Sequence, residues 1–118
     1  VPFQMGHKKK ARVGFVYGEF VAQFGVLRPG TGIGADVRAL KVKIFDLQVL
    51  RRERALAFAR AELIVGYQDP GDAYSSRQRE ALAESWEFIA DEARVRGISP
   101  VRYATAREAA IHLQQIAA

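Results

Sequence analysis

The sequence predicts a small α/β domain with a mostly parallel four-stranded sheet, built from βαβ units with helices packed on the sheet. The main observation is that strand-like and helix-like segments alternate along most of the chain. Two capping boxes also mark helix starts in the second half. The 118 residues are 49% hydrophobic and 26% charged, as in soluble globular domains. An α+β domain that begins with a β-hairpin is the alternative.

The length fits one domain, which we expect over residues 11–118. Residues 1–10 lack core-spaced apolar side chains and are predicted to form a flexible basic N-terminal arm. The absence of cysteine excludes disulfides and thiolate metal sites. No secretory signal or membrane span is visible, so a cytoplasmic location without membrane partners is the expectation.

Four segments have the alternation of apolar and polar residues that is typical of strands. They are residues 11–18, 39–47, 62–71 and 99–104. The clearest is 39–47, where Leu40, Val42 and Ile44 alternate with Lys41 and Lys43. Residues 19–38 are ambiguous, because they fit either a short helix or the return strand of a hairpin through Gly18. Residues 28–35 read as a glycine-rich connector in either case.

Three helices are predicted, and the last two have readable ends. Asp46 is placed as the N-cap of a helix over 47–61. Ser75 and Gln78 form a capping box for a helix over 76–96 that Gly97 ends. Thr105 and Glu108 form a second capping box for the C-terminal helix. Trp86 falls on the apolar face of the 76–96 helix and is predicted to lie in the core.

The positive charge is concentrated in the first half of the chain. The net charge is +5, but residues 1–60 carry +8 and residues 61–118 carry −3. Such an asymmetry favours an anionic partner, DNA or RNA before a membrane. The candidate contacts are Lys8, Lys9, Lys10, Arg12, Arg51, Arg52 and Arg54. The leading hypothesis is therefore a non-catalytic module that binds nucleic acid through its N-terminal half.

Four acidic residues lie at or just after the carboxyl ends of predicted strands and form a candidate Mg²⁺ site. They are Glu19, Asp46, Asp69 and Asp72. Carboxylates that converge at one sheet edge are the ligands that Mg²⁺ takes in nucleases and phosphotransfer enzymes. This layout resembles that of Toprim-type nucleic-acid enzymes, which place a Glu after a first strand and a D-x-D after a third. Residues 69–72 read D-P-G-D instead, and turn formation explains them equally well.

A third hypothesis is an assembly or interaction subunit that docks on a protein partner or on a second copy of the chain. The aromatic residues near the N-terminus favour it as an exposed apolar surface. His112 is predicted to lie off the inward face of the last helix, exposed to solvent. Because His7 and His112 stand far apart with no other histidine or cysteine, a zinc site is not expected. No motif in the sequence decides whether the protein is an enzyme.

Overall fold

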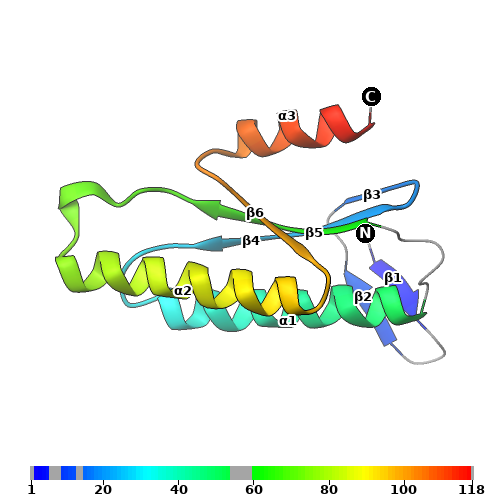
Figure 1. Cartoon of the computed structure of the whole chain (residues 1–118), viewed down its shortest axis with the longest axis horizontal. Helices are drawn as coiled ribbons and strands as arrows, with labels where there is room; N and C mark the ends of the chain where they lie inside the picture. The colour runs from blue at the N-terminus through cyan, green and yellow to red at the C-terminus, as the bar shows by residue number, and fades with distance from the viewer. Residues whose placement is uncertain (1, 6–8, 13–14, 54–59, 118) are drawn as a thin grey trace.

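A four-stranded mixed sheet forms the centre of the fold (Figure 1). The computed structural model describes residues 2–5, 9–12, 15–53 and 60–117, with side chains from residue 15 onward. The sheet order is β3 (Phe15–Tyr17), β4 (Phe20–Leu27), β5 (Arg60–Tyr67) and β6 (Ser99–Tyr103). β3 is antiparallel to β4, whereas β4, β5 and β6 are parallel. The predicted α/β class with a mostly parallel sheet is confirmed.

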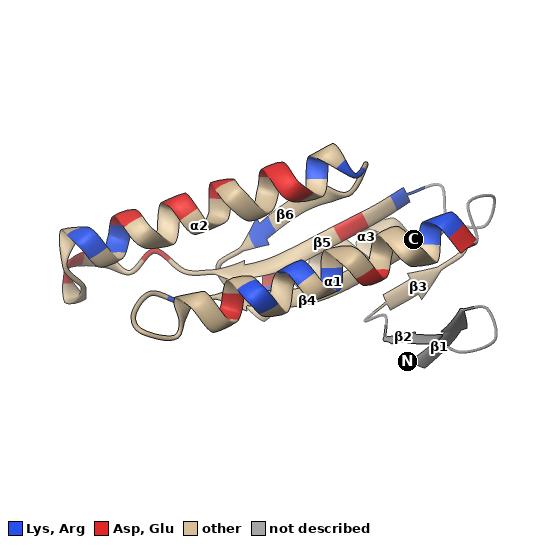
Figure 2. Ribbon diagram, turned by 90° about the horizontal axis from the view of Figure 1, so that it is seen from below, with Lys and Arg blue, Asp and Glu red and all other residues tan. Residues whose placement is uncertain are grey.

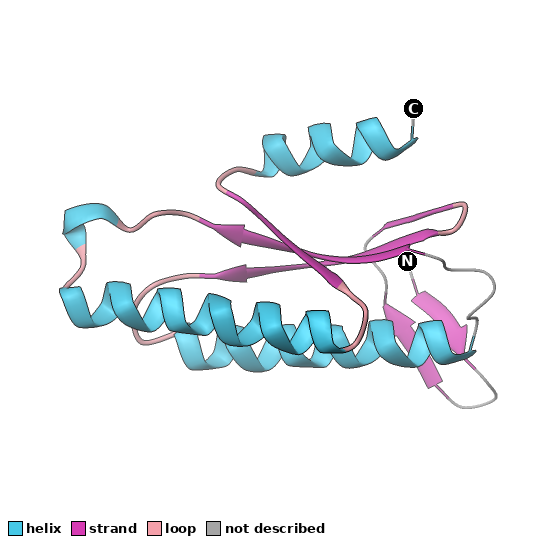
Figure 3. Cartoon of the chain, viewed as in Figure 1, coloured by secondary structure: helices cyan, strands magenta, loops and turns pink. Residues whose placement is uncertain are grey.

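Helices cover both faces of this sheet. They are α1 (Ile33–Glu53), α2 (Ser76–Val95) and α3 (Ala106–Ala117), with a short 3₁₀ turn, η1, at Gly71–Ala73. α1 and α2 lie on one face and α3 lies on the other (Figure 3). Two successive right-handed crossovers that step the same way across a sheet leave both helices on one side, which explains this arrangement. None of the described helices is both long and apolar enough to cross a membrane.

The N-terminal segments form a second, two-stranded sheet. β1 (Pro2–Met5) pairs antiparallel with β2 (Lys9–Arg12), and both strands contact α1. The division of the chain into an arm over 1–10 and a domain over 11–118 stays a prediction.

The predicted strand over 39–47 is wrong, because this segment is the middle of α1. Leu40, Ile44 and Leu47 face the sheet at the three- and four-residue spacing of a helix, while Val42 is 59% exposed. The predicted helix start at Asp46 is wrong for the same reason, since α1 begins at Ile33, near the end of the glycine-rich connector.

The strand that replaces it in the sheet is β4, within the ambiguous 19–38 segment. Tyr17 and Phe20 pair across the two-residue turn at Gly18, so the hairpin alternative is the correct one. Gly18 has a φ of 57°, which favours glycine there. β4 is buried on both faces over most of its length, as a central strand of a parallel sheet requires, and therefore lacks the polar alternation of an exposed strand.

The ends of α2 and α3 agree with the sequence. The Ser75 hydroxyl accepts from the Gln78 amide, and the Gln78 side chain accepts from the Ser75 amide, so the capping box is confirmed. Gly97 follows α2 with a φ of 73°. At α3 the Thr105 hydroxyl accepts from the Glu108 amide at 3.2 Å. The Glu108 carboxylate accepts from the Ala104 amide and not from the Thr105 amide, so the box differs from the predicted one.

Candidate functional site

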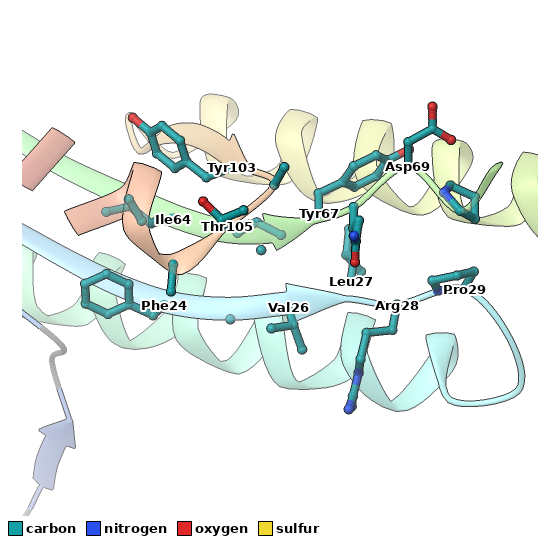
Figure 4. Close-up of a pocket in the computed structure, with 18 of the residues that line it drawn as sticks. Phe24, Val26, Leu27, Arg28, Pro29, Ile64, Tyr67, Asp69, Tyr103 and Thr105 are labelled. Atoms are coloured by element: carbon teal, nitrogen blue, oxygen red, sulfur yellow. The ribbon is translucent and has the colours of Figure 1, made fainter. Parts of the chain in front are cut away.

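A cleft of about 1220 Å³ opens at the carboxyl ends of the three parallel strands, between the sheet and α3. Its lining comes from three stretches of chain, which are residues 24–32, 64–70 with Tyr74, and 103–113. Figure 4 shows Phe24, Ile64 and Tyr103 at one end, and Arg28, Pro29 and Asp69 at the other. Ligands of open α/β sheets bind outside the carboxyl ends of the strands, so this is the candidate site.

The inner walls of the cleft are apolar. Phe20, Ala22 and Ile64 form the buried cluster of this face, and side chains of α3 pack on them. Leu113 both packs on this cluster and lines the cleft. Every residue of α3 nevertheless keeps some exposure, so the helix covers this face without sealing it. Small residues, among them Gly66 and Ala110, leave the space between α3 and the strand ends open.

The mouth of the cleft carries polar side chains. Arg28 bends away from α3 towards α1 (Figure 4), where its Nε and Nη2 donate to the Asp36 carboxylate at 3.2 and 2.9 Å. The Arg28 amide also donates to Asp36. These hydrogen bonds lower the pKa of Asp36, and burial opposes them only in part. The pair therefore fixes the loop after β4 to the first turns of α1.

A buried carboxylate lies farther inside, under α3. Glu62 is 2% exposed, and its Oε1 lies 2.7 Å from Nε2 of His112 on α3. Its other oxygen accepts from Arg60 Nη2, also at 2.7 Å. The His112 ring packs against Tyr103, with ring centroids 5.5 Å apart. Burial raises the pKa of Tyr103, and the nearby Glu62 and Glu108 carboxylates add to the shift.

A smaller hollow of about 470 Å³ lies beside the mouth and shares Tyr67 and Asp69 with the cleft. Here the Arg102 guanidinium lies over the ring of Tyr67, 4.5 Å from its centroid, and 5.2 Å from that of Trp86. Tyr67 and Trp86 are themselves in edge-to-face contact. These stacked groups form a continuous path from the cleft to the only tryptophan of the chain.

The four predicted metal ligands do not come together. Glu19 precedes β4 and Asp69 follows β5, so the two lie beyond opposite ends of paired parallel strands that alone span about 23 Å at 3.3 Å per step. Asp46 lies in the middle of α1. Asp69 accepts from the Gly71 amide within its own turn, and the exposed Asp72 accepts from Arg79. In the described part of the chain no three histidine, cysteine, aspartate or glutamate residues form a group that could hold a metal.

The predicted nucleic-acid contacts are only partly described. Lys8 and Arg54 lie outside the described residues, and Lys9, Lys10 and Arg12 belong to β2. Arg51 and Arg52 lie in the last turn of α1. Arg51 donates to the Gly97 carbonyl at 2.6 Å and so fastens the end of α2, whereas Arg52 is exposed.

The Glu62–His112 pair was not predicted from the sequence. His112 was expected to be exposed off the inward face, and this is wrong, because its side chain is only 21% exposed. The one available signal was Glu62 itself, a carboxylate inside the apolar segment Ala61–Val65 that must find a partner when buried. Nothing in the sequence indicated which of the later residues that partner is.

Comparisons of the chain with protein-family models, with curated proteins and with solved structures gave no match.

Proposed function

We propose that this protein binds nucleic acid through its basic end, defined as β2 and the last turn of α1. The observation that carries the proposal is the contact of β2 with α1, the helix whose last turn carries Arg51 and Arg52. This contact joins elements whose basic runs are about 40 residues apart in the sequence (Figure 1). Both runs belong to the half of the chain with a charge of +8. Clustered cations attract the phosphate backbone and release its counterions.

The test is fluorescence anisotropy with labelled single-stranded and duplex oligonucleotides at a series of salt concentrations. We expect affinity to fall as salt rises, with a logarithmic slope of about 0.7–0.9 for each phosphate contact. Neutralising Lys9→Gln, Lys10→Gln and Arg52→Gln together should lower this slope by about 2–3. Arg107→Gln, an exposed cation on α3, is the control and should change it little.

Two results would refute the proposal. One is binding that does not depend on salt, or no binding to DNA or RNA of either form. The other is an equal loss of affinity in the triple variant and in a set of three neutralised arginines on α2 and α3. The second result would mean that binding follows net charge rather than the basic end.

A second candidate function is assembly with another copy of the chain, through the solvent-facing side of α1 and α2. Val42, Phe45 and Phe88 are between 44% and 59% exposed there. α1 has five basic and three acidic residues, while α2 has three basic and five acidic ones (Figure 2). Charges of opposite sign on neighbouring helices suit a two-fold interface. Light scattering over a range of concentrations tests it, and a monomer at high concentration would exclude it.

A further inference from the structure

The cleft combines an apolar inner part with polar groups at its mouth. Its inner part is apolar, between Ile64 of the sheet and Leu113 of α3. Its mouth offers the Gln68 amide and the Asp69 carboxylate, whereas the Thr105 side chain lies near Ile64 at the other end (Figure 4). An amide and a carboxylate thus lie at one end of a space that is lined mostly by apolar side chains and tyrosines. A wholly apolar ligand would form no hydrogen bond with these mouth groups, and a compact ion would make little contact with the apolar walls.

We propose that this cleft binds a nucleobase, with the ring between the strand ends and α3 and its hydrogen-bonding edge at the mouth. The inference rests on the proposed function, because a nucleic-acid ligand supplies bases. Every base presents two flat faces for contact with aromatic and aliphatic groups, and an edge of donors and acceptors for amide and carboxylate partners. The base belongs either to a free nucleotide or to an unpaired residue of a strand, and the experiment separates the two.

The built-in probe is Trp86, the only tryptophan. Its ring contacts Tyr67, which lines the cleft, and Arg102 lies over both rings. A base that displaces or stacks on Tyr67 changes the surroundings of Trp86. We expect adenosine and cytidine monophosphates to change the fluorescence of Trp86 saturably, and isothermal titration to give the same affinity with one site per chain.

Filling the cleft should abolish this response. Ala110 is exposed and lines the cleft, so Ala110→Leu adds volume there without disturbing the core. We expect it to weaken mononucleotide binding by about tenfold or more, and Gln68→Leu at the mouth to weaken it less. Ala83→Leu on α2 is the matched control, because Ala83 is exposed and does not line the cleft. Equal thermal unfolding of the three variants shows that each is folded.

The two proposals fail in different ways. The triple variant of the basic end should lose oligonucleotide affinity and keep mononucleotide binding unchanged. If the base comes from a strand, Ala110→Leu also lowers affinity for single-stranded oligonucleotides and leaves duplex binding unaffected. If it comes from a free nucleotide, only the mononucleotide titration changes. A titration of both mononucleotides and a single-stranded oligonucleotide without any signal, or a signal that Ala110→Leu leaves intact, overturns the inference.

Discussion

The two faces of the sheet differ in how completely they are closed. On the α1 and α2 face, sixteen buried residues form one cluster, which includes Leu47, Leu63 and Ile89 at 0% exposure. On the α3 face, the buried cluster has three members, and the helix above it has no buried residue. The closed face carries most of the apolar burial that stabilises the domain. The open face carries the cleft, the buried Glu62 and the polar mouth, so the candidate site lies on the less tightly packed face.

The largest effect should come from the closed face. Trp86→Ala removes a ring that is 8% exposed and contacts Tyr67, and we expect it to destabilise the protein by about 3–5 kcal/mol. Phe88→Ala on the same helix is the control, because Phe88 is 44% exposed, and it should cost well under half as much. Chemical denaturation measures both. Equal losses in the two variants would contradict the assignment of Trp86 to the buried side of α2 and of Phe88 to its solvent-exposed side.

How much of the fold could be predicted depends on whether the signal for each helix is local, and it does not follow the two faces. α2 and α3 could be predicted because capping residues and apolar spacing act within one helix, and local rules decide them. α1 could not be predicted over 39–47, because Leu40 and Ile44 satisfy a period of two and a period of 3.6 equally well over five residues. Only the exposure of Val42, which depends on where the sheet lies, separates the two readings.

The site was less predictable, for a related reason. The candidate metal ligands were inferred from where the predicted strands end, so they depended on a correct assignment of the strands. Because Glu19 was taken to follow a parallel strand, it was placed at the wrong edge of the sheet. The cleft is built from three stretches of chain that meet only once β4, β5 and β6 are paired. The Glu62–His112 contact joins residues 50 positions apart, and no local pattern encodes it. The clustering of positive charge in the first half is a property of composition and needed no fold.

The second prediction concerns the polar contact that holds α3 on the open face. His112→Ala leaves the buried Glu62 with Arg60 as its partner, and Arg60 is more than half exposed. Loss of one partner from a buried carboxylate should cost about 2 kcal/mol. Amide hydrogen exchange should increase in α3 before it increases in α1 or α2. Gln115→Ala, an exposed change on α3, is the control. Unchanged exchange in His112→Ala would show that α3 is held by its apolar contacts alone.

A third prediction concerns how closely α1 packs on the sheet at Gly25 of β4. A Cβ on Gly25 would lie 2.3 Å from Cδ2 of Leu40, which is itself 1% exposed and cannot move aside freely. Gly25→Ala should therefore destabilise the protein by about 1–2 kcal/mol through overpacking. Gly32→Ala adds the same methyl where nothing lies within 4 Å, and it should be tolerated. Thermal unfolding of the pair compares them, and equal stabilities would mean that α1 shifts easily on the sheet.

The smallest expected effect lies at the mouth, where the two faces meet. Asp36 belongs to α1 and holds Arg28 at the end of β4, and hydrogen bonds from Arg28 lower the pKa of Asp36 below its ordinary value of 3.8. The folded protein therefore binds fewer protons there than the unfolded chain does in acid. It follows that the stability contributed by Asp36 rises with pH from its lowered pKa upward and is fully present above about pH 5.

Asp36→Asn removes this contribution, and we expect a loss of about 1 kcal/mol at neutral pH, because Arg28 is mostly exposed and solvent screens the pair. As the pH falls through the lowered pKa of Asp36, the wild type should lose its advantage and the two stability curves should converge. Asp72→Asn is the matched control, since Asp72 also accepts from an arginine but is fully exposed. A constant difference between wild type and Asp36→Asn from pH 7 to pH 2 would show that shape, rather than charge, makes Asp36 important. The loop after β4 would then be held to α1 by packing, as the helices of the closed face are held to the sheet.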